Sequence, residues 1–263
     1  MSAPPRETWL LDLGNSRAKL ARLEDGAPVE VTALDWTQPD FAARMCSLVE
    51  AWPRPRRILV ASVAPAARVE QLREGLPDGP AIDVEWLRSP RRACGVGNRY
   101  AHPERLGIDR FLSMVAVHAH VPKACIVVGC GTALTLDAVA ADGDHAAGLI
   151  ALSPGRMLDA LRNETAIADT NPDAFRADGG DDTATALQAG SWAAAGALVE
   201  WFAARQRVAL GGAPVWLHGG WAGTLAAWLA RDGFQVAVFE HAVLNGLAAW
   251  AAAGTVESAD RNR

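Results

Sequence analysis

Two stretches of the chain show the same order of an apolar run, a short turn and a renewed alternation of apolar and polar residues. In the first stretch, residues 9–11 are apolar, Asp12 follows, and the alternation resumes up to Leu23 after a small polar turn. This pattern predicts a strand, a tight turn and a second strand. The turn is formed by Gly14, Asn15 and Ser16, and the second strand carries Lys19.

The residue types in this first turn suit phosphate and metal chemistry. Gly14 has no Cβ, so a ligand could approach the backbone, and Ser16 adds a hydroxyl to the amides of the turn. A carboxylate such as Asp12, placed just before the turn, could hold a hydrated Mg²⁺ beside phosphate oxygens. The alternative is a β-hairpin in which these residues only make the turn.

The second stretch, residues 126–139, repeats the pattern. Gly131 and Thr132 take the places of Gly14 and Asn15, and Ala133 takes that of Ser16. Gly129 stands where the first copy has Asp12. Two such units predict a duplicated fold with a phosphate loop in each half and a nucleotide between the halves.

The remaining pattern alternates strands and helices, which predicts an α/β protein. Asp109 lies in the first turn of a helix that runs from the segment 100–110 to about His120, and a strand at 215–218 ends in Gly219 and Gly220. A carboxylate at a helix start is commonplace, because the helix dipole favours it by about 0.3–1 kcal/mol. Further strands are predicted at 27–34, 57–63, 81–87 and 234–239, and further helices at 41–51, 65–76, 157–163, 183–205, 221–231 and 243–253.

Composition and charge exclude several classes of protein. The chain has 263 residues and a formal net charge of −5, without a block of like charges, so a nucleic-acid surface is not indicated. The N-terminus lacks a signal-peptide core, and no apolar run reaches the length of a membrane span. The four cysteines show neither metal-ligand spacing nor a disulfide framework. We therefore expect a cytoplasmic protein that does not bind membranes.

Six ordered motifs resemble those of the type III pantothenate kinases, members of the acetate-and-sugar-kinase/Hsp70/actin superfamily. They are Asp12-x-Gly14-Asn15-Ser16 with Lys19; Tyr100-x-x-Pro103-x-x-Leu106-Gly107-x-Asp109-Arg110; Gly131-Thr132-Ala133-x-Thr135-x-Asp137; Gly148-x-Ile150 with Pro154-Gly155; Thr183-x-x-Ala186-x-x-x-Gly190; and Gly219-Gly220. The resemblance implies two RNase H-like (actin-like ATPase) domains facing a central cleft, which we divide at 1–118 and 119–263. It also implies a homodimer, ATP-dependent phosphorylation of pantothenate in coenzyme A synthesis, Mg²⁺, and a monovalent cation, K⁺ or NH₄⁺.

The motifs suggest a role for each matching residue. Asp109 is the candidate general base, and Arg110 suits the pantothenate carboxylate. By resemblance, Tyr100 and Gly107 would bind pantothenate, with Thr183 reaching over from a dimer partner. The ATP and phosphate residues would be Asp12 (also the Mg²⁺ ligand), Gly14, Asn15, Ser16, Lys19, Gly131, Thr132, Ala133, Gly219 and Gly220. Two alternatives are a catalytically impaired relative acting as an accessory or regulatory protein, and another phosphotransferase or phosphatase of the superfamily.

The chain departs from the family at one position. The family usually reads Asp-x-Gly-Thr-Ala in the second loop, whereas this chain has Gly129 in place of the aspartate. The departure removes a contact to a cation or phosphate, and Asp137 on the following strand does not simply replace it. A carboxylate restored at position 129 need not help, since Gly129 could occupy a backbone conformation that a Cβ would strain. Cys130 is interpreted as a small filler rather than a nucleophile.

Overall fold

The chain forms two compact units. The computed structural model describes residues 7–77, 79, 81–164 and 179–260, the last six without their side chains. One unit comprises Met1–Ala119 and Ala242–Arg263, and the other comprises His120–His241. The sequence-based division at 1–118 and 119–263 differs from this grouping in one element, the last helix, α7 (Ala242–Asp260), which belongs to the first unit.

The sheet of the first unit has the strand order β3-β2-β1-β4-β5. Strand β2 runs antiparallel to both of its neighbours, whereas β1, β4 and β5 are parallel. The strands are β1 (Thr8–Leu13), β2 (Arg17–Glu24), β3 (Ala27–Asp35), β4 (Arg57–Ser62) and β5 (Asp83–Trp86). The predicted strand–turn–strand at residues 9–23 is therefore confirmed, and the strand predicted at 81–87 corresponds to β5, at one edge of the sheet.

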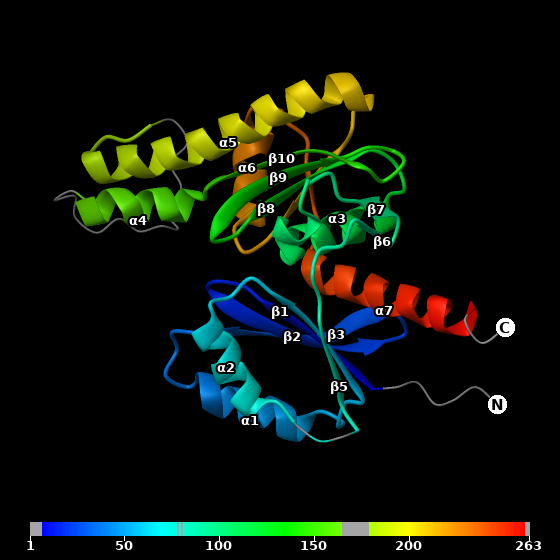
Figure 1. The fold of residues 1–263 in the computed structure, drawn as a ribbon. Helices are drawn as coiled ribbons and strands as arrows, with labels where there is room; N and C mark the ends of the chain where they lie inside the picture. The colour runs from blue at the N-terminus through cyan, green and yellow to red at the C-terminus, as the bar shows by residue number, and fades with distance from the viewer. Residues whose placement is uncertain (1–6, 78, 80, 165–178, 261–263) are drawn as a thin grey trace. The chain divides into compact units, whose positions relative to one another are not determined.

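Helices cover both faces of this first sheet. α1 (Phe41–Ala51) and α2 (Ala66–Gly75) lie on one face and α7 on the other, where it contacts β1, β3 and β4 (Figure 1). Phe41, Met45 and Leu72 pack with inward-facing residues of the strands. Burying each such side chain contributes about 1.5–3 kcal/mol, which explains why these short helices are held in place.

The segment that leads to the predicted base is less regular than the sequence indicates. A two-strand hairpin, β6 (Arg92–Ala93) and β7 (Val96–Gly97), and a short 3₁₀ turn, η1 (Pro103–Arg105), precede α3 (Ile108–His120). The helix begins at Ile108 and carries Asp109 in its first turn, as predicted, so it does not include the earlier part of the segment 100–110. Hydrogen bonds from side chains to the backbone hold residues 98–103 in a loop instead.

The second unit repeats the topology of the first. Its sheet has the order β10-β9-β8-β11-β12, with β9 antiparallel to its neighbours and β8, β11 and β12 parallel. The elements are β8 (Cys125–Cys130), β9 (Ala133–Val139), β10 (His145–Leu152), α4 (Pro154–Glu164), α5 (Thr183–Leu210), β11 (Val215–His218), α6 (Ala222–Arg231) and β12 (Ala237–Val238). The duplication predicted from the two turns is thus confirmed at the level of strand order. Strand β12 is shorter than predicted, and α4 begins three residues earlier.

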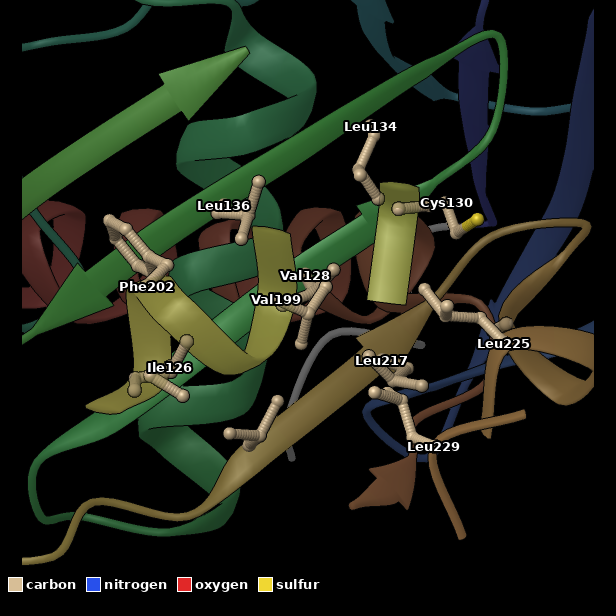
Figure 2. Packing of buried hydrophobic residues seen from close by; sticks show 14 of the residues in the cluster. Ile126, Val128, Cys130, Leu134, Leu136, Val199, Phe202, Leu217, Leu225 and Leu229 are labelled. Atoms are coloured by element: carbon tan, nitrogen blue, oxygen red, sulfur yellow. The ribbon is translucent and has the colours of Figure 1, made fainter. Parts of the chain in front are cut away.

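One face of the second sheet carries the main core of its unit. Alternate residues of β8 and β9 point toward α5 and α6, which contribute Val199, Phe202, Leu225 and Leu229 (Figure 2). Cys130 is fully buried in this cluster, and burial raises the pKa of its thiol to about 12. A thiol with so high a pKa is not a nucleophile at neutral pH, so the interpretation of Cys130 as a filler agrees with the structure. No helix among the described residues is both long and apolar enough to span a bilayer.

Candidate active site

The first turn joins β1 to β2 and is closed by its own backbone. Gly14 donates its N–H to the carbonyl of Arg17 at 3.1 Å, and its own carbonyl accepts from the indole Nε1 of Trp36 at 2.9 Å. Asp12 and Lys19 are direct partners across the two strands, with Lys19 Nζ 3.9 Å from Asp12 Oδ2. The alternation of the hairpin therefore places the lysine beside the carboxylate.

Asp12 is buried, with 8% of its surface exposed, and its environment opposes ionisation. Burial raises the pKa of its carboxyl from 3.8 to about 6, the nearby Lys19 charge lowers it, and the charge of Asp109 raises it. The effect of Asp109 shows that the predicted metal ligand and the predicted base lie in one neighbourhood of the first unit. Burying a carboxylate costs stability, and carboxylates of raised pKa cluster at functional sites. The raised pKa of Asp12 therefore marks it as a candidate functional residue.

Asp109 is the second residue of α3, and the local backbone fixes its carboxylate. Its Oδ1 accepts from the N–H of Arg110 at 2.8 Å, and its carbonyl accepts from Ser113 Oγ at 2.8 Å. A Cβ on Gly107 would lie 2.6 Å from Asp109 Oδ1. The glycine in the Gly107-x-Asp109 motif therefore leaves room for the carboxylate.

Arg110 and Tyr100 complete the cluster in the first unit. Arg110 is 6% exposed, and its Nη1 donates to the Tyr100 hydroxyl at 3.1 Å. The fold thus brings together four residues predicted to bind substrate, namely Tyr100, Gly107, Asp109 and Arg110, near the predicted metal ligand.

Two further residues of this region, Arg91 and Asn98, were not identified from the sequence. Arg91 donates to three backbone carbonyls of the loop that carries Tyr100. The Asn98 side chain accepts from the N–H of Tyr100 and donates to the carbonyl of Pro103. Bonds from side chains to carbonyls leave no periodic pattern in a sequence. The sequence feature that could have indicated the hairpin before this loop is Gly95, since a glycine suits the second position of a two-residue hairpin turn.

In the second unit, two predicted nucleotide-binding segments are adjacent at the carboxyl ends of β8 and β11. Gly131 donates its N–H to the Ala133 carbonyl at 3.0 Å, and Ser153 Oγ donates to the Thr132 carbonyl at 3.0 Å. The turn after β11 lies against this one: Trp221 donates its N–H to the Cys130 carbonyl at 3.1 Å. Gly219 has a φ of +100°, and a Cβ there would lie 2.5 Å from the same carbonyl. In open α/β sheets, ligands bind at the carboxyl ends of parallel strands.

Gly129 stands at the end of β8, directly opposite His218 of β11. Its φ lies outside the left-handed region, so the expectation of a strained backbone is wrong. The obstacle is steric instead: a Cβ would lie 2.5 Å from Thr135 Oγ1 and 3.0 Å from His218 Nε2. The side chains of Thr135 and His218 occupy the space that the Cβ of an aspartate at position 129 would need.

Asp137 does not supply the absent carboxylate. Its Oδ1 lies 2.9 Å from His145 Nε2, and both side chains are buried. Asp137 pairs with Val127 and Gly148 in the middle of the sheet, two residues from the register position of Gly129. The second turn therefore carries no acidic side chain among its described residues.

A side chain added at Gly129 should destabilise the protein. We expect Gly129→Asp to lower the free energy of unfolding by about 1–3 kcal/mol, the usual cost of overpacking. Chemical denaturation measures the change, and Gly131→Ala is the control, because a Cβ at Gly131 meets nothing within 4 Å. Adding Thr135→Ala should recover part of the loss, since it removes the nearest atom. Equal stability of Gly129→Asp and the natural protein would contradict this account.

The fold and the residues at its turns define the class of protein first. The two equivalent sheets, each with a turn at the end of its first strand, form the two-domain actin-like fold that was predicted from the sequence. A protein from Campylobacter jejuni assigned to the Baf family of transcriptional activators has a TM-score of 0.57 at 18% identity, covering 97% of this chain and all of that one. A protein from Sinorhizobium meliloti assigned as a 2-dehydro-3-deoxygalactonokinase also has a TM-score of 0.57, at 17% identity, covering 95% of this chain and 98% of the other.

Sequence relatives then define the family. The model of the type III pantothenate kinase family matches residues 9–205. A type III pantothenate kinase of Xanthomonas euvesicatoria pv. vesicatoria is 38% identical over 253 residues, which cover 93% of this chain and 97% of the relative. Another, from Stenotrophomonas maltophilia, is 36% identical over 254 residues, covering 92% and 96%. The chain belongs to the type III pantothenate kinase family.

Proposed function

We propose that this protein transfers the γ-phosphoryl group of ATP to the 4′-hydroxyl of pantothenate, the first step of coenzyme A synthesis. Membership of the family over residues 9–205 carries this proposal. The carboxylate of Asp109, whose charge raises the pKa of the Asp12 carboxyl, supports it. Phosphoryl transfer demands chiefly positioning and charge neutralisation, and the first unit offers both.

The residues of the first unit would divide the chemistry among them. Asp109 would accept the proton of the pantothenate hydroxyl as its oxygen attacks the γ-phosphorus. Arg110, a permanently charged and fork-shaped donor, would bind the pantothenate carboxylate, with the Tyr100 hydroxyl beside it. Gly107 would contribute by leaving space for the base.

Asp12 fits a hydrated Mg²⁺. It is a buried carboxylate whose pKa is raised to about 6, and the lysine 3.9 Å away neutralises it only partly. No cluster of three or more His, Cys, Asp or Glu side chains capable of holding a metal occurs among the described residues, so such an ion would need phosphate oxygens and water as its other ligands. When bound, Mg²⁺ supplies neutralisation of phosphate charge.

The turns would bind the phosphates and the nucleotide through their backbone. In the first unit these residues are Gly14, Asn15 and Ser16, with Lys19 beside them. In the second unit they are Gly131, Thr132 and Ala133, together with Gly219 and Gly220 after β11. Exposed backbone N–H groups in such turns suit anions.

We propose that the protein works as a homodimer in which Thr183 binds pantothenate held by the other copy. Thr183 is exposed at the first turn of α5 in the second unit, while the other proposed substrate residues lie in the first unit. The same helix exposes Trp201 and Val208, at 51% and 88%, which are apolar surfaces that a second copy could cover. Light scattering of the purified protein tests the dimer.

The direct test is an assay of the purified protein with ATP, Mg²⁺ and pantothenate, in which phosphopantothenate is detected by mass spectrometry. We expect ADP and phosphopantothenate in equal amounts. ADP release that pantothenate does not stimulate, or no product under any salt condition, would overturn the proposed activity.

The absence of a carboxylate at position 129 should also weaken the response to monovalent cations. A carboxylate beside a bound cation acts mainly through its charge, and that action is strongest where water is excluded. We therefore expect K⁺ or NH₄⁺ to change the rate of pantothenate phosphorylation no more than Na⁺ does at the same ionic strength. Strong activation specific to K⁺ or NH₄⁺ would show that a cation site exists without an acid at this position.

A further inference from the structure

The hairpin formed by β6 and β7 brings Arg91 directly opposite Asn98. Its turn residues, Cys94 and Gly95, have φ values of +49° and +80°, the conformation of a two-residue type I′ turn. Arg92 pairs with Gly97, so the next position outward pairs Arg91 with Asn98, whose N–H donates to the Arg91 carbonyl at 2.8 Å. The side chain of Arg91 is thereby set beside the loop that follows the hairpin.

The guanidinium of Arg91 bonds to three successive parts of that loop. Its Nη1 donates to the carbonyl of Asn98 at 2.8 Å and to that of Tyr100 at 2.7 Å, and its Nη2 donates to the carbonyl of Ala101 at 3.1 Å. Residues 98–102 have no helix or strand to hold them. A planar, permanently charged fork can satisfy several carbonyls at fixed positions, which a single ammonium cannot do.

Asn98 holds the same loop from inside. It is 3% exposed; its Oδ1 accepts from the N–H of Tyr100 at 3.0 Å, and its Nδ2 donates to the carbonyl of Pro103 at 2.9 Å. Both backbone groups of Tyr100 are thus bonded to side chains, and its hydroxyl accepts from Arg110. The position of the phenol is fixed at both ends.

We propose that Arg91 is a positioning residue for the acid substrate. It holds the backbone of Tyr100, and through the phenol it sets Arg110, which is proposed to bind the carboxylate of pantothenate. The inference rests on the proposed function but adds a residue outside the family motifs that identified the site. Because Arg91 is exposed and bonds only to a loop, its loss should loosen the substrate site without unfolding the unit.

Steady-state kinetics of Arg91→Ala provide the first test. We expect kcat/KM for pantothenate to fall by about 10- to 100-fold, since a displacement near 1 Å can cost about that much, mostly through KM. The KM for ATP and the melting temperature should stay close to the natural values. Arg91→Lys should recover only part of the loss. Arg92→Ala is the matched control, because this adjacent exposed arginine donates to Gly95 at 3.4 Å within the hairpin turn.

A spectroscopic test is independent of turnover, because Tyr100 is the only tyrosine in the chain. Labelling with 3-fluorotyrosine gives a single ¹⁹F resonance that reports on its phenol. In the labelled protein that carries no substitution (the otherwise natural protein), pantothenate should shift this resonance at pH 7. In Arg91→Ala the free resonance should move or broaden, and the pantothenate titration should saturate at about tenfold higher concentration, whereas Arg92→Ala should follow the natural protein.

The outcomes separate the two proposals. If pantothenate leaves the resonance of the otherwise natural protein unchanged and no phosphopantothenate forms, the proposed function fails. If that protein responds but Arg91→Ala gives the same resonance, the same titration and the same KM, the positioning role of Arg91 is overturned. A loss of melting temperature in Arg91→Ala, with equal effects on the KM of both substrates, would assign Arg91 a purely structural role and would also overturn it.

Discussion

Asp109→Asn should leave a folded protein whose turnover is reduced by about 10²–10⁴-fold, the range expected when a general base is lost. The amide oxygen of asparagine can still accept the N–H of Arg110, so the start of α3 should remain intact. What disappears is the ability to take the proton from the attacking hydroxyl. The kcat for pantothenate phosphorylation measures the loss, while the KM for ATP should change little.

Asp142→Asn is a suitable control for this change. Asp142 is an exposed carboxylate that also accepts a backbone N–H, from Asp144 at 3.0 Å, so the substitution repeats the chemistry away from the cluster. We expect unchanged turnover. A well-folded Asp109→Asn protein with near-normal kcat would show that Asp109 is only a helix-start carboxylate.

Asp12→Asn should make the metal-free protein more stable and the enzyme less active. The pKa of the Asp12 carboxyl is raised from 3.8 to about 6, so the folded state holds this proton more tightly than the unfolded state. Unfolding then releases a proton between these two pH values, and the stability of the natural protein falls as pH rises through that window. At pH 7 the buried charge costs up to about 3 kcal/mol, and asparagine removes it.

Denaturation with and without Mg²⁺ measures this effect. We expect the natural protein with ATP to gain stability from Mg²⁺, and Asp12→Asn to gain less, while its Mg²⁺-dependent activity is weakened. Asp40→Asn is the control, because Asp40 is exposed and its side chain makes no capping bond to α1. An unchanged Mg²⁺ titration of activity in Asp12→Asn would mean that Asp12 only shapes the turn.

Local pattern was sufficient to predict most elements of the fold. Helix α1 begins and ends where expected, at Phe41 and Ala51, because an amphipathic run is bounded by Trp52-Pro53. The pattern could not assign α7 to a unit. That helix is rich in alanine and apolar residues on all sides, so nothing local indicates which sheet it covers. It also continues to Asp260, beyond the predicted end at residue 253.

At the site, too, the local sequence pattern does not show which distant segments come into contact. Alternation on both sides of a turn predicts a hairpin, and the hairpin at residues 9–23 was predicted in this way, although the pairing of Asp12 with Lys19 was not. The crowding at Gly129 could not be predicted, because Thr135 and His218 reach it from two other strands. Arg91 was missed because its partners are carbonyls of an irregular loop, which any residue type could supply.

The return of α7 to the first unit has a consequence for synthesis on the ribosome. All strands of the first sheet emerge early, yet the helix that covers one face of it is made only after residue 241. The second unit, residues 120–241, is contiguous and can fold as soon as it leaves the exit tunnel. The part of the chain made first is therefore the part completed last, and until α7 has been made one face of its sheet lacks the helix that covers it.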